Sequence, residues 1–429
     1  MSYPEAIQFL YGLRLFGAKF GLENTFQLDT LAGHPQDKLR FIHVAGTNGK
    51  GSTCAMLESI YRAAGLRVGL FTSPHLVSFR ERIQINRHWI GQDDVVRLVE
   101  EMKPLFMHFP DGHHPTFFEA VTVMALKFFA EQKCDLVIWE TGLGGRLDAT
   151  NIVTPLATVI TNIQLDHQQW LGDTLGKIAA EKAGIIKPGV PVLTATDEPE
   201  ALTVIEQTAR EKKAPLTQIR SSEFGVRNLE LRLPGEHQKL NAALALAVVE
   251  VLQNQIPVTG EKIRVGLQTV DWPGRLQLIT RDSGQRVLLD GAHNPAGAKT
   301  LSHALRKDFS SQRMTLVLGV LQDKDWQQIC ETLVPLAARI FTVPVSSGRS
   351  ANPEELAEVC RKANPSAGVI ACHSLGDALD QAARAAFVVI TGSLYLVGEA
   401  LEKLGQVSAG SEERGLNEWT GAPSLPLPG

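Results

Sequence analysis

The sequence predicts an α/β fold with mainly parallel, doubly wound sheets, and three observations support this. Short apolar segments without polar–apolar alternation recur along the 429 residues, as in strands buried on both faces. Segments with a helical period separate many of these strands, an alternation typical of parallel sheets with helices on both faces. In the first half, a glycine-rich segment joins one such strand directly to a helix.

Composition and charge restrict the class of protein. Hydrophobic residues make up 44% of the chain and charged residues 21%, close to globular averages, which excludes collagen-like, coiled-coil and wholly disordered proteins. The net charge of −4 offers no field for nucleic acid. No apolar run reaches the roughly 18 residues of a membrane helix, and the N-terminus lacks signal-peptide features. The 5 cysteines form no CxxC pair, which is typical of proteins in a reducing cytoplasm. From the charge, the apolar runs and the cysteines together, we expect a cytoplasmic protein without nucleic-acid or membrane partners.

The first predicted domain builds its sheet from strands buried on both faces. Three of these strands are predicted at 40–45, 135–139 and 156–163. The helix after the first strand covers 51–64, with apolar residues on one face and a glycine as its C-terminal cap. The segment 188–236 has weaker periodicity and several prolines, and it could hold a few antiparallel strands at the sheet edge.

The second predicted domain begins after Asp271-Trp-Pro-Gly274, where proline and glycine separate two well-patterned regions. Pro295 and Pro353 mark two helix starts. We therefore expect domains at 1–273 and 274–407, followed by a disordered, Gly/Pro-rich tail at 408–429. The predicted strands are 286–289, 315–320, 339–345, 368–372 and 387–391, and the helices lie near 296–308, 326–337, 353–363 and 376–386.

The segment Gly46-Thr-Asn-Gly-Lys-Gly-Ser-Thr53 lies between a predicted strand and a predicted helix. Phosphate groups need accessible backbone N–H groups, a helix N-terminus and a cation, and this segment supplies all three. Its glycines allow close approach, Lys50 can reach terminal phosphates, and Ser52 or Thr53 can help to hold Mg²⁺. It departs from G-x-x-x-x-G-K-[ST] because a glycine separates Lys50 from Ser52. We interpret it as a phosphate-binding loop; the alternative is a glycine-rich turn with an exposed lysine.

Charged residues follow two other predicted strands of the first domain. Glu140 ends an apolar run, where an unpaired carboxylate is costly unless a cation or several donors compensate it. Mg²⁺ suits this position at the carboxyl end of a parallel strand, and a salt bridge to Arg146 is the alternative. For His167, metal ligation and a structural role both stay open. Lys182 lies in an apolar helical run, where the residues alone favour an exposed stem with a solvated ammonium.

Acids, amides and glycines also follow the predicted strands of the second domain. Because these segments fall on one edge of the sheet, they predict a second binding surface. A G-x-G-x-x-G pattern is missing, which argues against dinucleotide binding. On the helix predicted at 237–253, Asn241 lies off the apolar face, where it could read a purine edge or be an ordinary surface residue. The polar segments are 289–295, 319–325, 346–350 and 391–393.

Together these motifs resemble the folylpolyglutamate synthase/dihydrofolate synthase family, a branch of the Mur ligase superfamily. The likeness runs from about residue 3 to 404, with order and spacing maintained. The segments that carry it are HVAGTNGKGST (43–53), TSPHLVSFRERI (72–83), WETGLGGRLDATN (139–151), LDH (165–167), EKAGIIK (181–187), WPGRLQ (272–277), DGAHNPAG (290–297), GVLQDKD (319–325) and ITGSLY (390–395).

The resemblance implies a P-loop ATPase domain and a C-terminal Rossmann-like domain with the active site between them. It implies that ATP phosphorylates a carboxylate of a pterin substrate and that the amino group of L-glutamate attacks the acyl phosphate. His75 and Arg146, within SPHL and GGRLDATN, resemble the bifunctional type that acts on dihydropteroate and on reduced folates. A folylpolyglutamate synthase without the second activity is the alternative, and a P-loop switch or transport ATPase is a more distant one. We expect a monomer that uses ATP and two Mg²⁺ ions.

The resemblance also implies roles for individual residues, with Lys50, Lys182 and His293 as catalytic groups. Lys182 matches a lysine carried as a carbamate, and His293 lies where glutamate and acyl phosphate should meet. Ser73, Glu140 and His167 match Mg²⁺ ligands. The matches to ATP contacts are Asn48, Gly49, Lys50, Gly51, Ser52, Asn241, Arg275 and Asp290. The matches to pteroate contacts are Thr116, Phe117, Phe118, Glu119, Leu147, Asp148 and Ala149, together with 17–20.

Overall fold

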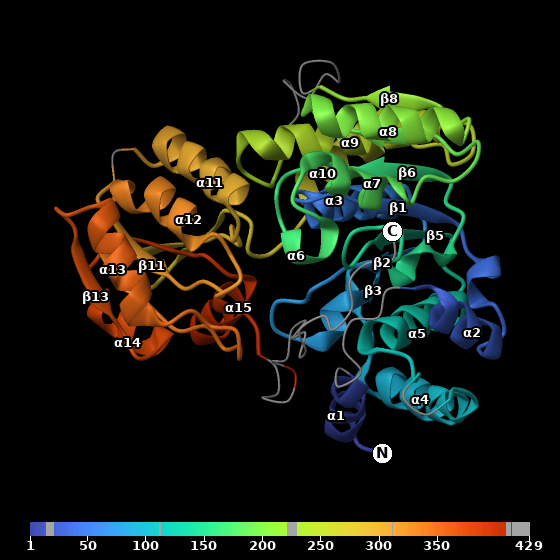
Figure 1. Cartoon of the computed structure of the whole chain (residues 1–429), viewed down its shortest axis with the longest axis horizontal. Coiled ribbons are helices and arrows are strands. Elements are labelled where there is room, and N and C mark those ends of the chain that lie inside the picture. The colour runs from blue at the N-terminus through green and yellow to red at the C-terminus, as the bar shows by residue number, and fades with distance from the viewer. Residues whose placement is uncertain (14–20, 111–112, 221–229, 311, 409–412, 414–429) are drawn as a thin grey trace.

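The computed structural model describes the whole chain except residues 14–20, 111–112, 221–229, 311, 409–412 and 414–429. The described residues form two α/β lobes that lie side by side (Figure 1). The first lobe holds an eight-stranded sheet and the second a six-stranded sheet, both mainly parallel. The α/β fold class predicted from the sequence is therefore confirmed.

The sheet of the first lobe places the glycine-rich segment at its centre. Its strand order is β4-β3-β2-β5-β1-β6-β7-β8, and β1 pairs in parallel with both β5 and β6. The carboxyl ends of these three strands therefore open at the same edge. The strands are β1 (Phe41–Ala45), β2 (Val68–Phe71), β3 (Ile83–Ile85), β4 (His88–Trp89), β5 (Leu136–Glu140), β6 (Ala157–Ile160), β7 (Val192–Thr194) and β8 (Leu216–Gln218).

The segment 188–236 differs from the sequence expectation. Strands β7 and β8 pair in parallel, and β7 is also parallel to β6, so the antiparallel strands expected there are wrong. Helix α8 (Pro199–Glu211) connects β7 to β8 and supplies the crossover that a parallel pair needs. The prolines mark element starts instead of breaking elements: Pro199 opens α8, and Pro191 and Pro215 directly precede the two strands.

Helices cover both faces of this sheet. On one face, α3, α9 and α10 form a core with β1, β2, β5 and β6. A Cβ on Gly266 of α10 would lie 2.5 Å from the Cα of Ile60, so this glycine allows α10 and α3 to pack closely. The helices are α1 (Tyr3–Gly12), α2 (Glu23–Leu31), α3 (Lys50–Ala63), α4 (Gln92–Met102), α5 (Phe117–Glu131), α6 (Gln168–Leu171), α7 (Leu175–Ala183), α9 (Glu236–Val251) and α10 (Gly260–Thr269).

The chain enters the second lobe between Thr269, which ends α10, and Gln277, which begins β9. The strand order there is β13-β12-β11-β14-β10-β9, with β9 antiparallel to β10. Helices α11 and α13 begin at Pro295 and Pro353, as predicted. The elements are β9 (Gln277–Thr280), β10 (Arg286–Leu289), α11 (Pro295–Asp308), β11 (Met314–Leu318), α12 (Trp326–Leu333), β12 (Ala337–Thr342), α13 (Pro353–Ala363), β13 (Gly368–Ala371), α14 (Leu375–Gln381), β14 (Phe387–Thr391) and α15 (Leu394–Lys403).

Most of the C-terminal segment expected to be disordered, 408–429, lies outside the described residues. Glu413 is described and is buried against the first lobe, where its carboxylate accepts hydrogen bonds from the Ser78 hydroxyl and the Phe79 N–H. Among the described residues, no helix is both long and apolar enough to cross a membrane.

Candidate active site

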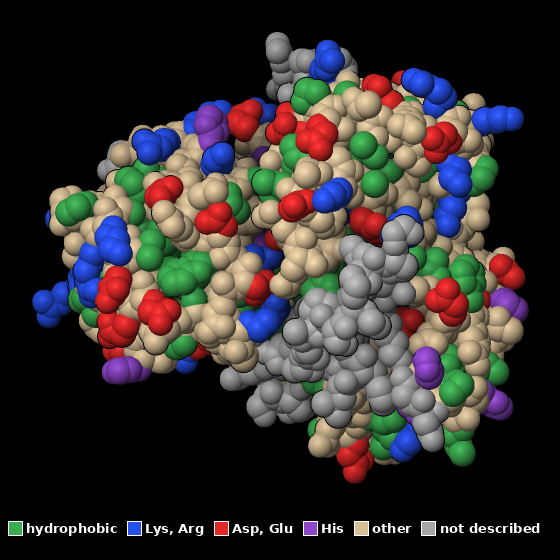
Figure 2. Space-filling model, viewed as in Figure 1, with side chains coloured by type: hydrophobic (Ala, Val, Ile, Leu, Met, Phe, Trp, Pro, Cys, Tyr) green, Lys and Arg blue, Asp and Glu red, His purple; other side chains and the backbone are tan. Residues whose placement is uncertain are grey.

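A cleft of about 1190 Å³ lies between the two lobes and is lined by residues from both. Acidic and basic side chains are visible where the lobes meet, as they are over the rest of this face (Figure 2). The first lobe contributes the glycine-rich loop and the residues that follow β5 and β6. The second lobe contributes residues that follow β10, β11 and β14. The cleft is therefore bounded by the carboxyl-end edges of both sheets, which is where open α/β sheets bind ligands.

The glycine-rich loop between β1 and α3 forms one wall of the cleft. Gly46 and Gly49 have φ values of 146° and 88°. A Cβ on Gly49 would lie 2.5 Å from Asn241 Oδ1, so glycine is required there for space as well as for conformation. Gly49 is the N-cap of α3 and has no side chain to cover the first N–H groups of that helix. Lys50 Nζ lies 3.1 Å from the carbonyl oxygen of Gly46, which keeps the ammonium in the cleft wall.

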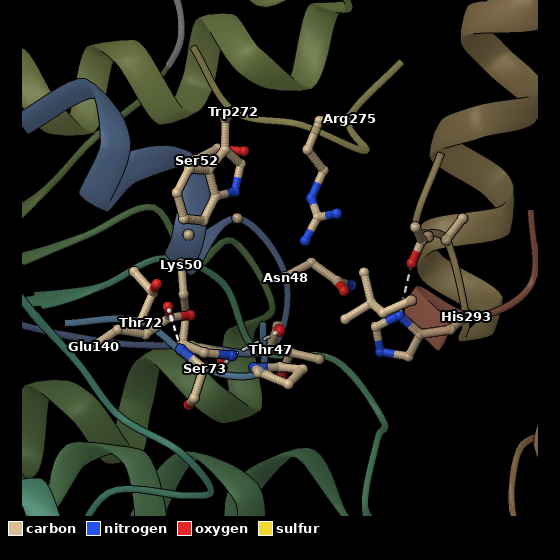
Figure 3. A pocket seen from close by; sticks show the side chains of 18 of the residues that line it. Thr47, Asn48, Lys50, Ser52, Thr72, Ser73, Glu140, Trp272, Arg275 and His293 are labelled. Atoms are coloured by element: carbon tan, nitrogen blue, oxygen red, sulfur yellow. Dashed lines mark hydrogen bonds between the residues drawn. The ribbon is translucent and has the colours of Figure 1, made fainter. Parts of the chain in front are cut away.

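Helix α9 supports the loop from behind. Asn241 Nδ2 donates to Gln238 Oε1 at 2.9 Å, and Gln238 Nε2 donates to Ser52 Oγ at 3.2 Å. Asn241 is buried and lines the cleft, so its alternative as a surface residue is wrong. Trp272 covers the start of α3: a Cβ on Gly51 would lie 2.9 Å from its ring (Figure 3). No role was predicted for Gln238 from the sequence, although its spacing of three residues from Asn241 placed both on one helix face.

Glu140 is 4% exposed at the end of β5. Its Oε2 accepts a hydrogen bond from the Ser73 N–H at 3.3 Å. Burial raises the pKa of Glu140 to about 7, and nearby Lys50 opposes that rise. Arg146 pairs with Glu181 at 2.8 Å, so the salt bridge considered for Glu140 is not formed. The Ser73 hydroxyl is buried and has no hydrogen-bond partner within the described part of the chain.

His167 is at the N-terminal end of α6 and borders the same cleft. Burial lowers the pKa of His167 to about 3, so its imidazole is neutral near pH 7, which is the form that binds metals. In the described residues, no three His, Cys, Asp or Glu side chains converge as a complete metal site. Any ion held by Glu140 and His167 would therefore need the Ser73 hydroxyl, phosphate or water as further ligands.

Lys182 of α7 is buried beneath the glycine-rich loop, and its Nζ donates to the Gly46 carbonyl at 2.8 Å. The solvated ammonium expected from the residues alone is therefore wrong. Burial lowers the pKa of Lys182 to about 7, and the positive charge of Lys50 lowers it further in the same direction. Much of this amine is consequently unprotonated at neutral pH.

The second lobe presents three of the predicted residues to the cleft: Arg275, Asp290 and His293. Figure 3 shows two of them, Arg275 and His293. Asp290 follows β10 and accepts hydrogen bonds from the N–H groups of Leu276 at 2.9 Å and Ala292 at 3.0 Å. It therefore fixes the two segments that carry Arg275 and His293. The Nδ1 of His293 lies 2.7 Å from the carbonyl oxygen of Gly291, so Nε2 is the nitrogen left to face the first lobe.

The described residues matched to pteroate contacts do not line this cleft. Thr116 and Glu119 form the capping box of α5, and Asp148 accepts hydrogen bonds from Leu143 and Thr150. Phe118 packs behind Gly142, where a Cβ would lie 2.5 Å from its ring. Phe118 and Asp148 therefore support the cleft wall at 142–144 without lining the cleft themselves. Phe117, Leu147 and Ala149 lie in the same two segments, and 17–20 falls outside the described residues.

Comparison with known proteins gives matches to two family models along the chain. Residues 44–249 match the Mur ligase middle domain, and residues 274–394 match the Mur ligase glutamate ligase domain. The dihydrofolate synthase/folylpolyglutamate synthase of Bacillus subtilis is 37% identical over 428 residues, covering 94% of this chain and 99% of the relative. The enzyme of the same name from Haemophilus influenzae is 35% identical, covering 83% of this chain and 87% of the relative.

Solved structures agree with these sequence matches. The folylpolyglutamate synthase of Thermotoga maritima superposes with a TM-score of 0.84 at 34% identity, covering 96% of this chain and 99% of that chain. The FolC protein of E. coli in complex with DHPP and ADP has a TM-score of 0.84 at 31% identity, with coverages of 94% and 98%. The chain therefore belongs to the dihydrofolate synthase/folylpolyglutamate synthase family of Mur ligases and is an ATP-dependent ligase.

Proposed function

We propose that this enzyme adds L-glutamate to dihydropteroate, which forms dihydrofolate, and also to the γ-carboxylate of folylpolyglutamates. The observation that carries the proposal is the cleft itself, in which a phosphate-binding loop on one lobe faces Arg275 and His293 on the other. ATP is the co-substrate. Relatives named for both activities, from Bacillus subtilis and Haemophilus influenzae, support the bifunctional assignment.

The proposed reaction activates an acid and then delivers an amine. A carboxylate oxygen of the folate substrate attacks the γ-phosphorus of ATP, and ADP leaves. The amino nitrogen of glutamate then bonds to the acyl carbon, the C–O bond to phosphate breaks, and a proton is lost from nitrogen. Lys50 counters the charge of the transferring phosphoryl group. The two lobes exclude water that would otherwise hydrolyse the acyl phosphate.

We assign ATP binding to the loop and to the residues that face it. The uncovered N–H groups at the start of α3 suit phosphate oxygens, and the buried Asn241 amide suits a purine edge. Arg275 projects into the cleft from the segment that Asp290 fixes. The proposed ATP-binding residues are Asn48, Gly49, Lys50, Gly51, Ser52, Asn241, Arg275 and Asp290.

The donor set that follows β2, β5 and β6 fits Mg²⁺. Glu140 is a buried carboxylate with no cation within ion-pair distance among the described residues, and the Ser73 hydroxyl beside it is buried without a partner. Glu140, Ser73 and the neutral His167 would hold the ion, while ATP phosphates complete its oxygen shell. Bound Mg²⁺ would neutralise charge that develops on the phosphoryl oxygens.

We propose that Lys182 carries a carbamate. The unprotonated amine adds to carbon dioxide, an N–C bond forms, and one proton leaves to solvent. The lowered pKa supports this because only the neutral amine is nucleophilic. The product is an anion directly beneath the loop, so it can help to hold a second Mg²⁺ ion. His293 is assigned to the place where glutamate meets the acyl phosphate.

We propose that the pteroate group binds beside the wall at 142–144. Phe118 and Asp148 hold that wall in place. The residues that would shape this site are Thr116, Phe117, Phe118, Glu119, Leu147, Asp148 and Ala149.

The ATPase unit is assigned to 1–273 and the glutamate-binding unit to 274–407, which agrees with the two sheets and the two family matches. A monomer suffices, because one chain supplies both sides of the cleft. A reducing cytoplasm agrees with the free thiols of all five cysteines.

A product assay tests this function. The purified chain is incubated with ATP, Mg²⁺ and L-glutamate, with either dihydropteroate or tetrahydrofolate, and glutamylated products are identified by mass spectrometry. Product with both acceptors is expected. Product with tetrahydrofolate alone would indicate a folylpolyglutamate synthase without the second activity. Phosphate release that needs neither acceptor would indicate a switch ATPase. Lys50→Ala should abolish product formation with either acceptor.

A further inference from the structure

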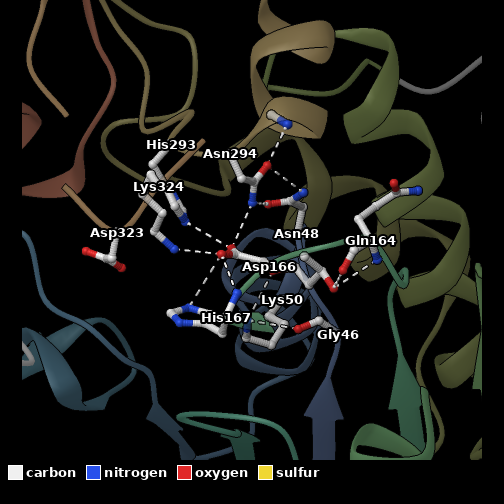
Figure 4. A network of polar contacts seen from close by, with 12 residues as sticks. Gly46, Asn48, Lys50, Gln164, Asp166, His167, His293, Asn294, Asp323 and Lys324 are labelled. Atoms are coloured by element: carbon white, nitrogen blue, oxygen red, sulfur yellow. Dashed lines mark hydrogen bonds and ion pairs between the residues drawn. The ribbon is translucent and has the colours of Figure 1, made fainter. Parts of the chain in front are cut away.

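Side chains of the second lobe converge on one carboxylate of the first lobe, Asp166 (Figure 4). Lys324 Nζ lies 2.6 Å from Asp166 Oδ1, and Asn294 Nδ2 lies 3.0 Å from Asp166 Oδ2. His293 Nε2 is 3.7 Å from the same Oδ2. The side chains of Asp166 and Lys324 are each 8% exposed, so this ion pair is buried where the two lobes meet.

The same group of residues reaches the phosphate loop. Asn294 Nδ2 also lies 3.1 Å from Asn48 Oδ1, and the Asn48 N–H donates to Asn162 Oδ1 at 2.8 Å. Asn294 Oδ1 accepts from the Gly297 N–H at 2.8 Å and thereby caps α11. Because Asn294 directly follows His293, these contacts connect the phosphate loop with the segment that carries His293.

A second ion pair between the lobes provides a comparison. Lys307 of α11 lies 2.5 Å from Glu236 of α9, but these two side chains are 51% and 44% exposed. An exposed pair of this kind contributes about 0 to 1 kcal/mol. Removing one partner of a buried pair is far more disruptive, because it leaves an uncompensated charge. The Lys324–Asp166 pair is therefore the contact able to hold the lobes in one alignment.

We propose that Asp166 and Lys324 are positioning residues for the glutamate-adding step. Their ion pair aligns the second lobe on the phosphate loop, so that His293 and the incoming amine face the acyl phosphate. This inference rests on the proposed ligase function. When the pair is broken, the first lobe still carries Lys50 and the phosphate loop, but the amine is misplaced. Water then bonds to the acyl carbon, the C–O bond to phosphate breaks, and the carboxylate is regenerated with no amide formed.

The test compares Lys324→Met with Lys307→Met, which breaks the exposed pair. The measurements are the ratio of phosphate released to amide formed, the KM for L-glutamate, the KM for ATP, and ADP affinity by calorimetry. For Lys324→Met we expect a ratio several-fold above that of the wild type and a KM for glutamate raised about 10-fold or more, since misplacement weakens amine capture. ADP affinity should stay within about 3-fold, because the phosphate loop is intact. Lys307→Met should match the wild type in all four.

Two further variants keep the test decisive. Lys324→Arg retains the charge and should restore much of the coupling, and Asp166→Asn keeps the volume but should uncouple as Lys324→Met does. Lys324→Met combined with Asp166→Asn should cost little more than either of these two variants alone, as for residues that act as one unit. Three outcomes would overturn the proposal. They are additive effects of Lys324→Met and Asp166→Asn, an unchanged ratio of phosphate to amide in Lys324→Met, and an equal loss of ADP affinity in Lys324→Met and Lys324→Arg. A wild type that makes no glutamylated product would instead refute the ligase function itself.

Discussion

The amine of Lys182 lies 2.8 Å from the backbone carbonyl oxygen of Gly46, so a buried, ionisable side chain touches the phosphate loop from beneath. A buried ammonium in contact with one carbonyl and near the positive Lys50 is electrostatically unfavourable, which is why the pKa of Lys182 falls to about 7. Conversion of this amine to an anion would remove the repulsion from Lys50 and provide a ligand for a cation. The position therefore favours a modified lysine over an unmodified one.

Replacing Lys182 with alanine should abolish turnover and leave a cavity beneath the loop. A short carboxylic acid such as acetate can enter that space and restore a negative charge, so we expect partial rescue of the rate. The measurement is product formation by Lys182→Ala with increasing acetate. Lys177→Ala on the same helix, whose ammonium is exposed and pairs with Asp173, is the control and should respond to acetate as the wild type does. Rescue by acetamide to the same extent would contradict a role for the charge.

Gly49→Ala should weaken ATP binding. The added Cβ would meet Asn241 Oδ1 at 2.5 Å, so the loop must shift away from α9. Gly284 has a similar φ of 79° with open space around it, which makes Gly284→Ala a matched control for the backbone cost alone. Gly284→Ala should lose about 1 kcal/mol of stability by chemical denaturation, and Gly49→Ala should lose more because of the added contact with Asn241. Only Gly49→Ala should raise the KM for ATP, by about 10-fold or more. Equal KM values for ATP in the two variants would show that the loop around Gly49 does not bind the nucleotide.

Asn241→Ala should raise the KM for ATP more than the KM for dihydropteroate. The amide lies against the loop and bonds to Gln238, which bonds in turn to Ser52 of α3, so its loss affects the nucleotide side of the cleft. A buried polar group left without its partner costs about 1 to 3 kcal/mol, which corresponds to roughly a 5- to 150-fold change in KM. The reverse ranking of the two KM values would place Asn241 elsewhere.

The sequence revealed residues whose roles depend on local pattern, and it failed where roles depend on distant partners. The glycine-rich loop was identifiable because strand, loop and helix are contiguous. The residues around Lys182 wrongly indicated a solvated ammonium, because an apolar helical run is equally compatible with a solvated and with a buried lysine. The ammonium is buried because the glycine-rich loop, which is distant in sequence, lies above it. The Asp166–Lys324 contact spans 158 residues and two lobes, so no local pattern could indicate it.

Glu140 should make the stability of the metal-free and nucleotide-free protein depend on pH. Its pKa is raised from 4.5 to about 7 by burial, so between these values the folded protein binds a proton that the unfolded chain has released. The contribution of Glu140 to the free energy of unfolding should therefore fall as pH rises through this window, by up to roughly 3 kcal/mol, while His167 and His43, whose pKa values are lowered to about 3 by burial, contribute in the opposite direction. In denaturation measurements with EDTA present, the free energy of unfolding of the wild type minus that of Glu140→Gln should therefore fall as pH rises through this window.

Mg²⁺ provides the complementary measurement, because a cation favours the ionised carboxylate. Adding Mg²⁺ to the wild type should raise the free energy of unfolding more at pH 7.5 than at pH 5, where protonated Glu140 competes with the ion. In Glu140→Gln, this pH-dependent gain should disappear, while Glu131→Gln, on the exposed surface of α5, should keep it. A gain in Glu140→Gln equal to that of the wild type at both pH values would exclude Glu140 as a ligand, because the stabilising ion would then be bound by other groups.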